Sequence, residues 1–496
     1  MSMDQTANRK AAPSAAAPAL SDREKNVIIA GVLLSMLLAA LDQTIVAPAM
    51  PTIGASLGDA HYLPWIVTGY LLTATAIAPL YGKISDIHGR RVTIHAAILI
   101  FLAGSIISAL APNMLALIAG RAVQGLGGGG LFAMSQTVIG DLVPPRERAR
   151  YAAWISGTWA VASVAGPLLG GAFAEHMHWS LIFWINLPLG LVAMAIINTP
   201  LKKLPPAARR HTIDGWGALL LIAATGLLLL ALNWGGSAYA WTSPEILGLL
   251  AGFAVLTAAF TLRLMMAAEP LIGIEVLANR IVLTGALAVF MLQASNVGLT
   301  VYLPVYLQSW LGLTAGESGI ALLGLMLGTV AGATTSGRLI PRFAHYKRIA
   351  LYGTAFAGIC LVALALVAGS RSLLLIEALT ALIGFGSGTT FPVSTVSVQN
   401  AVDRAHLGVA TGVLTFLRSL GAALGVAALG AVALGYGLPL AGEGSAAVAE
   451  TIESATPFTI IFLAAAAMIL CSFLMLALMP EKPLRGGAPA DAPVLE

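Results

Sequence analysis

The sequence predicts an all-α membrane protein with fourteen transmembrane helices, and three observations support that prediction. The first is composition: only 10% of the 496 residues are charged and 58% are hydrophobic, whereas a soluble domain carries charge at about a quarter of its positions. A soluble enzyme is excluded, because there is too little polar surface to cover a globule of this length. The other two are the lengths of the apolar runs and the placement of the basic residues.

Fourteen apolar runs are long enough to cross a hydrocarbon layer of about 30 Å, which needs about 20 helical residues. Backbone polar groups cannot stay unpaired in lipid, so each run is predicted to be a helix. The runs lie at residues 27–47, 63–81, 92–111, 114–139, 151–173, 180–200, 215–233, 246–265, 281–309, 316–336, 349–368, 373–398, 408–435 and 457–479.

The basic residues predict the orientation of the chain. If both termini are cytoplasmic, every Lys and Arg except Arg121, Arg371 and Arg418 falls in the tails or the inner loops. Membrane proteins concentrate Lys and Arg on the inner side, so this bias predicts an even number of spans and two cytoplasmic ends. The net charge of +4 therefore indicates topology rather than nucleic-acid binding.

Glycines reveal an internal repeat. A shift of 255 residues superposes Gly82 on Gly337, Gly157 on Gly412, Gly166 on Gly421 and Gly170 on Gly425. Spans one to six and nine to fourteen are thus predicted to be parallel six-helix repeats, with spans seven and eight as an inserted helix pair. The predicted parts are a disordered cytoplasmic tail (1–25), an N-terminal six-helix bundle (26–200), an inserted two-helix linker (201–280), a C-terminal six-helix bundle (281–479) and a second cytoplasmic tail (480–496).

Two charged residues inside the first bundle are predicted to meet. A charge in a spanning helix costs about 2.5–3.5 kcal/mol, so it needs a reason. At 1.5 Å per residue, Asp42 lies about 22 Å and Arg121 about 20 Å from the inner face. Burial favours the neutral acid and a guanidinium favours the carboxylate, so a small movement can change the protonation of Asp42. We expect Asp42 to accept a proton and Arg121 to tune it; a purely structural salt bridge is the alternative.

The second bundle offers Glu377 near the outer end of its span and Arg418 near the middle of the next. Glu377 is a candidate for proton coupling or substrate binding, although at that depth it can also simply reach water. The candidates for a substrate-binding pocket are polar residues at mid-span: Gln124, Gln136, Gln293, Asn296, Glu377 and Arg418. For the amides, interhelical hydrogen bonding is the commoner role.

The fifth span contains Gly166-Pro167-Leu168-Leu169-Gly170-Gly171. Small residues four apart let two helix backbones approach closely, and a proline removes one helical hydrogen bond. The pattern therefore predicts tight packing and a bend. The sequence has no Walker A and no H-E-x-x-H pattern, so we expect no ATP, no cofactor and no metal site, and hence no enzyme.

Several motifs together resemble the major facilitator superfamily, and in detail its fourteen-span drug:proton antiporter branch, the EmrB/QacA-like proteins. Gly82-Lys83-Ile84-Ser85-Asp86-Ile87-His88-Gly89-Arg90-Arg91 resembles the signature loop between spans two and three. The segments similar to the branch's other patterns are Leu41–Val46, Arg121–Gly125, Gly166–Gly171, Phe183–Pro188 and Arg418–Gly425.

The resemblance implies specific roles for these residues. In the signature loop, Gly82, Asp86, Gly89, Arg90 and Arg91 would latch an inner gate, with the Asp meeting a helix N-terminus. Gly166, Pro167, Gly170 and Gly171 would form the motif associated with antiporters. This family resemblance also implies proton-coupled multidrug efflux by alternating access across a bacterial plasma (inner) membrane.

The expected partners follow from the same resemblance. They are small amphipathic or cationic molecules, protons and the lipid bilayer, with no nucleic acid; an accessory efflux protein is an open possibility. The alternatives are a proton symporter or an exporter of one specific metabolite. A membrane-embedded enzyme or a receptor is disfavoured, because the sequence has no sizeable domain outside the spans and no catalytic cluster.

Overall fold

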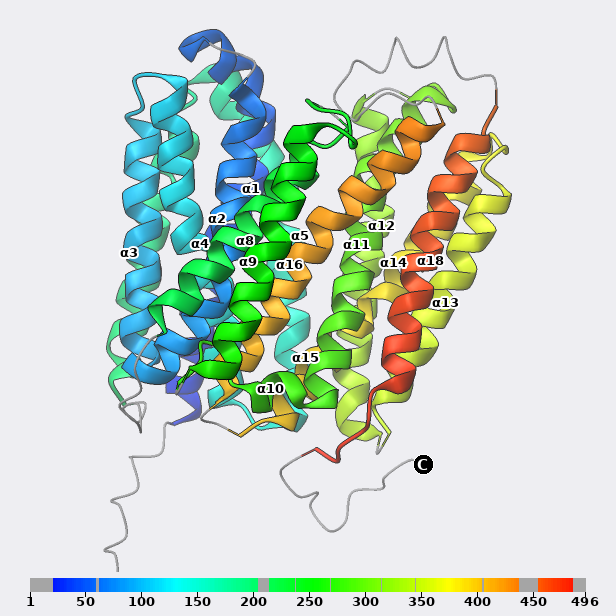
Figure 1. Cartoon of the computed structure of the whole chain (residues 1–496). Helices are drawn as coiled ribbons and strands as arrows, with labels where there is room; N and C mark the ends of the chain where they lie inside the picture. The colour runs from blue at the N-terminus through cyan, green and yellow to red at the C-terminus, as the bar shows by residue number, and fades with distance from the viewer. Residues whose placement is uncertain are drawn as a thin grey trace, which may run out of the picture.

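The protein consists of long helices that lie side by side and run roughly in one direction (Figure 1). This computed structural model describes residues 21–58, 62–203, 214–236, 238–267, 269–313, 315–343, 345–403, 406–436 and 454–484. Among them, fourteen helices are long and apolar enough to span a membrane, and β-structure is limited to isolated bridges, one of which joins Gly235 and Tyr239. The predicted all-α fold is confirmed. We call the side where the first helix begins and the last one ends the lower side, as in Figure 1.

The helices form two groups joined by an inserted pair. The first group comprises α1 (Asp22–Leu57), α2 (Leu63–His88), α3 (Arg90–Ala109), α4 (Met114–Leu142), α5 (Pro145–His176), α6 (Leu181–Trp184), α7 (Asn186–Asn198) and the short η2 (Pro200–Lys203). The pair is α8 (Gly215–Trp234) and α9 (Pro244–Met266), followed by the short α10 (Ile274–Ala278). The second group comprises α11 (Arg280–Ser309), α12 (Ala315–Leu339), η3 (Ile340–Arg342), α13 (Lys347–Leu366), α14 (Leu373–Gly388), α15 (Thr390–Ala401), α16 (Leu407–Gly435) and α18 (Thr456–Leu478).

Capping residues set where several helices begin. The Ser21 side chain accepts from the backbone N–H of Glu24, and the Glu24 side chain accepts from the backbone N–H of Ser21. Helix α1 therefore starts at Asp22, inside the stretch predicted to be a tail. Asn113 and Ser243 cap α4 and α9 in the same way. Gly89, with φ of +88°, ends α2 and starts α3 at once, a conformation that favours glycine. Residues 1–20 and 485–496 of the predicted tails lie outside the described residues.

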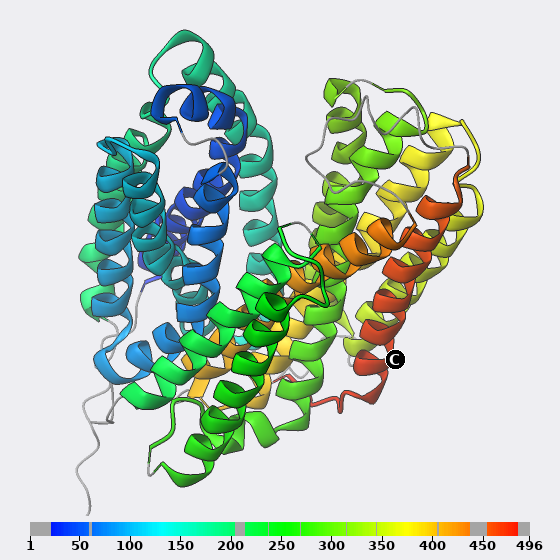
Figure 2. The same ribbon diagram turned by 45° about the horizontal axis from the view of Figure 1, so that its top comes forward.

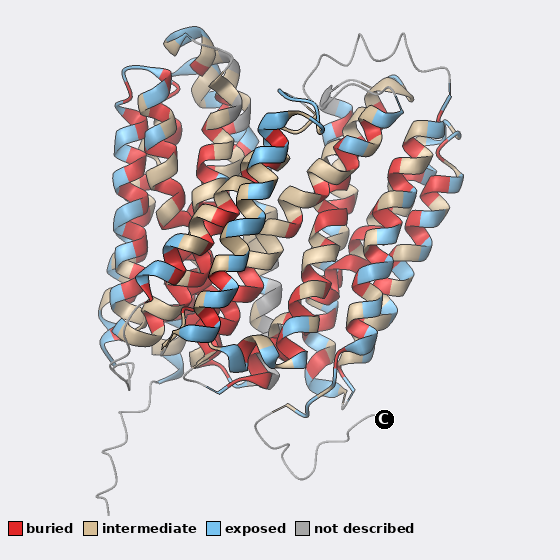
Figure 3. Cartoon of the chain, in the orientation of Figure 1, coloured by how far each residue is buried: buried red, intermediate tan, exposed pale blue. Residues whose placement is uncertain are grey.

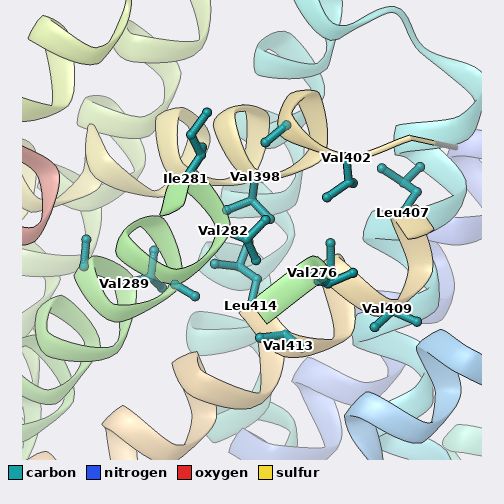
Figure 4. Packing of buried hydrophobic residues seen from close by; sticks show 14 of the residues in the cluster. Val276, Ile281, Val282, Val289, Val398, Val402, Leu407, Val409, Val413 and Leu414 are labelled. Atoms are coloured by element: carbon teal, nitrogen blue, oxygen red, sulfur yellow. The ribbon is translucent and has the colours of Figure 1, made fainter. Parts of the chain in front are cut away.

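The two groups have separate apolar interiors. In the second group, buried Val282, Val398 and Leu414 bring α11, α15 and α16 together (Figure 4). The outward faces are also apolar: Leu99, Leu168, Val255 and Leu366 are all exposed, and exposed residues follow the outer faces of the helices in Figure 3. Exposed apolar surface on so many helices is what lipid-facing surfaces require.

The groups meet along two seams, α2 with α16 and α5 with α12. The inserted pair packs on the first seam, where α8 contacts both α2 and α16, and Figure 2 shows α8 and α9 lying over this side of the molecule. Trp234 of α8 meets Trp65 of α2 edge to face at 5.7 Å between ring centroids. Both hydrogen bonds between the two groups in the described residues, described below, lie in the lower half.

Candidate functional site

Asp42 and Arg121 form an ion pair inside the first group. The Arg121 guanidinium, on α4, donates to Asp42 Oδ2, on α1, at 2.5 Å. Asp42 has no exposed surface and Arg121 has 1%. Asp42 and Arg121, which the sequence placed at about the same depth in the membrane, are thus in direct contact and buried from solvent.

Three further polar side chains complete this acid cluster. Gln124 Nε2 and Asn186 Nδ2 donate to Asp42 Oδ1 at 2.7 and 2.9 Å. Both amides also donate to Ser105 Oγ, at 2.7 and 3.1 Å. All of these side chains are fully buried, so α1, α3, α4 and α7 are joined around one carboxylate. Gln124, expected to line a substrate pocket, instead belongs to this cluster.

Arg121 also ties the cluster to α2. Its Nε donates to the Ile66 carbonyl at 3.0 Å, and its guanidinium carbon lies 4.5 Å from the Tyr70 ring centroid and 5.8 Å from that of Phe183. A desolvated cation above an aromatic face gains up to about 2 kcal/mol. Removal of the negative charge on Asp42 would therefore alter the contacts of a side chain that holds α1, α2 and α4 together.

The glycines of α5 bring its backbone against α1 at the level just above Asp42. A Cβ added to Gly166 would lie 1.9 Å from Thr44 Oγ1, and one added to Gly170 would lie 2.2 Å from the Ile45 carbonyl oxygen. Thr44 Oγ1 also donates to the Ala162 carbonyl at 2.8 Å. Two motif members take no part in this contact: Pro167 lies on the exposed side of α5, and a Cβ on Gly171 would meet nothing within 4 Å.

The signature loop forms a second charged cluster at the lower side. Arg90 donates to Asp86 Oδ1, to Ser85 Oγ and to Asp141 Oδ2, the last two at 2.6 Å. Asp86 Oδ2 accepts from the backbone N–H of Val409 at 3.2 Å. Val409 lies in the first turn of α16, where free N–H groups and the helix dipole favour a carboxylate. We call this contact of the loop with Val409 the latch, because it joins the two groups at the lower side.

Glycines let the backbones meet at the latch. A Cβ on Gly82 would lie 2.4 Å from the Gly408 carbonyl oxygen, so α2 and α16 touch backbone to backbone. Arg91 turns away and donates to Asn198 Oδ1 of α7 at 2.8 Å, within the first group. Gly82, Asp86 and Arg90 therefore take part in the contact between groups or brace it, whereas Arg91 does not.

Gln136 of α4 lies at the lower side too, where α4 meets α15 and α16 of the second group. We call this region and the latch together the lower seam. Its carbonyl accepts from Gln399 Nε2 of α15 at 3.3 Å, and that nitrogen also donates to Thr411 Oγ1 of α16 at 3.3 Å. Gln136 is 5% exposed. Its backbone thus joins the two groups on the lower side, and the expectation that its side chain lines a substrate pocket stays a prediction.

The remaining predicted residues are not brought together. Asn296 is buried and donates to the Leu292 carbonyl of its own helix at 3.1 Å, while Gln293 is half-buried on α11. Glu377 and Arg418 are half-buried on α14 and α16, and within the described part of the chain neither side chain has a hydrogen bond or ion pair. In the part of the chain that the structure describes, neither residue therefore belongs to a buried ion pair like that of Asp42 and Arg121.

Four contact residues were missed in the sequence. Asn186 and Ser105 hold the acid cluster, Asp141 holds Arg90, and Gln399 bridges the lower seam. For Asn186 a signal existed, because an amide in the interior of an apolar span needs a partner. For the other three, only the packing of helices distant in sequence reveals the role.

An apolar groove of about 610 Å³ opens between α1, α5 and α12. Leu33, Leu37, Trp154, Val161 and Val330 contribute to its lining. It lies at the seam that the inserted pair does not cover. The described residues contain no cluster of three or more His, Cys, Asp or Glu side chains that could hold a metal ion.

Comparison with known proteins decides the family. The family model described as Major Facilitator Superfamily matches residues 32–426, and a second match covers residues 285–494. The chain belongs to the Major Facilitator Superfamily. Membership makes it a membrane transporter rather than an enzyme, and matches the two-group fold.

Curated relatives in the superfamily include efflux proteins. The chain is 34% identical over 415 residues to multidrug transporter protein MdtP of Bacillus subtilis, covering 82% of this chain and 75% of that one. It is 32% identical over 405 residues to multidrug resistance protein 3 of the same species, covering 82% and 79%. The MFS-type efflux pump LUC4 of a Fusarium species is 35% identical over 425 residues, covering 83% and 74%.

Solved structures share the superfamily fold. The proton:xylose symporter XylE matches with a TM-score of 0.63 at 15% identity, over 94% of this chain and 98% of that one. The human organic anion transporter MFSD10 matches with a TM-score of 0.62 at 18% identity, over 91% and 99%. At these identities the likeness concerns the fold alone.

Proposed function

We propose that the protein is a proton-coupled multidrug exporter, a drug:H⁺ antiporter of the fourteen-span EmrB/QacA-like branch. The observation that carries the proposal is the fully buried Asp42–Arg121 pair. The names of the multidrug and efflux relatives support drug export. The apolar groove between α1, α5 and α12 suits amphipathic compounds.

The proton would act through α2. Protonation of Asp42 removes its attraction for Arg121, which also holds the Ile66 carbonyl of α2. The same helix bears Asp86, twenty residues further on or about 30 Å away at 1.5 Å per residue. Because a helix transmits displacement along its length, a shift of α2 at Ile66 would loosen the contact of Asp86 with Val409. The proton site and the latch would thus be coupled through one rigid element.

We place the protein in the bacterial plasma membrane with both termini cytoplasmic, so that the lower side faces the cytoplasm. The basis is the concentration of Lys and Arg in the lower loops. The latched lower seam then represents the state closed to the cytoplasm. Each proton that enters down a potential of 100 mV would release about 2.3 kcal/mol to drive export. The N-terminal bundle (26–200) and the C-terminal bundle (281–479) would rock against each other.

The experiment is transport in proteoliposomes with an imposed pH gradient, comparing the wild-type protein with Asp42→Asn. The proposal expects drug and protons to move in opposite directions, and the variant to lose gradient-driven transport while it stays folded. Undiminished proton-driven transport by Asp42→Asn would refute the role of this acid. Movement of both solutes in the same direction would establish a symporter instead.

A further inference from the structure

Arg418 lies on a face of α16 that borders the first group at its lower end and packs on α11, through Gly421 and Gly425, at its upper end. Thr411, seven residues earlier and hence on the same helical face, accepts from Gln399, which also bonds the carbonyl of Gln136 on α4. Thr415 lies on this face too and is 4% exposed. The lower part of this face thus looks toward the meeting point of α4, α15 and α16. Arg418 stands about 10 Å above the Gln399–Thr411 contact, on the upper side of the lower seam.

Among the described residues nothing accepts from the Arg418 guanidinium, although it is half-buried near the middle of a spanning helix. A guanidinium has five N–H donors and stays charged at every physiological pH. The other mid-span arginine, Arg121, differs in this respect, because Asp42 neutralises it. An unpaired charge at such depth is costly and marks a site for an ion or substrate.

Among the described residues, no acid forms an ion pair with Arg418. Glu377 precedes Gln399 by 22 residues along α14 and α15, so it lies about 22 Å above the level of Arg418 along the helix direction. Asp42 already accepts three hydrogen bonds within the first group. Neither of these two acids therefore supplies a counter-charge for Arg418.

We propose that Arg418 binds the anionic group of the transported compound, so that the preferred cargo is an amphipathic organic acid, such as an aromatic carboxylate. This assignment rests on the proposed export function and names its substrate class. A guanidinium presents a planar pair of donors that matches a carboxylate in a bidentate geometry. A lipophilic cation at the same place would be repelled, in contrast to the cationic cargo that the family resemblance suggests.

The test measures equilibrium binding by the full-length protein in nanodiscs of zwitterionic lipid, without any gradient. Three probes share one ring system and differ in charge: pyrenebutyrate, pyrenebutanol and pyrenebutylammonium. Energy transfer from tryptophan to pyrene, above that of empty nanodiscs, reports saturable binding. The expected order of affinity is acid, alcohol, cation, with the acid at least tenfold tighter than the alcohol. Equal binding of the acid and the alcohol, or tighter binding of the cation, overturns the proposal.

Two variants localise the effect. Arg418→Gln should weaken pyrenebutyrate at least tenfold and leave pyrenebutanol within threefold, whereas Arg418→Lys, which keeps the charge, should retain most of the preference for the acid. A loss of acid and alcohol binding alike would mean a merely structural role and would overturn the assignment. If Arg418→Gln does not fold, the wild-type series and Arg418→Lys still decide.

A final arm separates cargo from lipid. Competition by phosphatidylglycerol incorporated into the nanodiscs would assign the anion to a lipid headgroup and overturn the cargo assignment. These binding results are independent of proton transport. A preference for acids without proton coupling would support the Arg418 site and refute the antiport mechanism. Proton-coupled export without a preference for acids would support the mechanism and refute the Arg418 site.

Discussion

Asn186 Nδ2 lies 2.9 Å from Asp42 Oδ1, and the other oxygen of that carboxylate lies 2.5 Å from the Arg121 guanidinium. With Gln124 on Oδ1 as well, only donors surround the acid. A carboxylate can accept about four hydrogen bonds, so a proton on Asp42 would remove the charge that holds these donors and would weaken their bonds. Under the proposed mechanism, protonation of Asp42 and movement of a neighbouring helix would be linked through these contacts.

Replacement of Arg121 by Gln should destabilise the protein strongly. Breaking a buried ion pair from one side leaves an uncompensated charge, which costs about 3–5 kcal/mol. In the double variant Asp42→Asn, Arg121→Gln no unpaired carboxylate remains, so much of the loss should be recovered. Thermal unfolding of the four proteins in detergent measures this as a double-mutant cycle. Additive losses would mean that the pair does not interact as its geometry indicates.

Replacement of Asn186 by Ala should impair both stability and coupling. A hydrogen bond to a charged group contributes about 1.5–3 kcal/mol, and the variant removes one from Asp42. We expect a lower unfolding temperature and at least a tenfold loss of gradient-driven transport. Asn296→Ala is the matched control, because that amide bonds only the Leu292 carbonyl of its own helix. Equal effects of the two substitutions would contradict the prediction.

The glycines of α5 provide a graded test of helix contact. Gly170→Ala places a methyl group 2.2 Å from the Ile45 carbonyl oxygen, and such overpacking costs about 1–3 kcal/mol. Gly171→Ala adds the same group where nothing lies within 4 Å, and alanine favours the helix by about 1 kcal/mol over glycine. Gly170→Ala should therefore lower the unfolding temperature, and Gly171→Ala should keep or raise it. A loss of stability in the control would show that α5 has a partner on that face.

The latch is tested by Asp86→Asn. The change removes the ion pair with Arg90 and weakens the acceptor for Val409 N–H, so the lower seam should open more often. Spin labels on the lower ends of α2 and α16 would report a larger population at long distances in pulsed electron resonance. Asp141→Asn removes another Arg90 contact without touching α16, and should shift the distribution less. An unchanged distance distribution in Asp86→Asn would show that Asp86 does not hold the lower seam closed.

The spans were predictable because the hydrocarbon layer imposes a length on each one. The predicted span 215–233 is α8 within one residue and 457–479 is α18 within one residue. Ends outside the layer were less predictable: α1 continues to Leu57 rather than ending near residue 47, because apolarity stops marking a helix once it reaches water. The span at 180–200 is observed as α6 and α7.

The same reasoning explains which site residues could be found. Depth follows from sequence position alone, so the level shared by Asp42 and Arg121 was predictable. The direction in which a side chain points, and which of the other helices stands there, is set by packing. For that reason Ser105 and Gln399 were missed, and so were the bond of Gln124 within the acid cluster and that of the Gln136 carbonyl across the lower seam.

The inserted pair has little to do with either cluster. Only 11% of the most apolar stretch of α9 is buried, and α8 is fastened to α2 by Trp234 on Trp65 and by Asn233 on Thr68. Helix α9 therefore lies outside the two six-helix groups, and its outer surface is apolar and mostly exposed. That surface should accept apolar substitutions at little cost in stability. It is also a suitable place to attach a rigid fusion protein for electron microscopy, because the attachment would not touch the acid cluster or the latch.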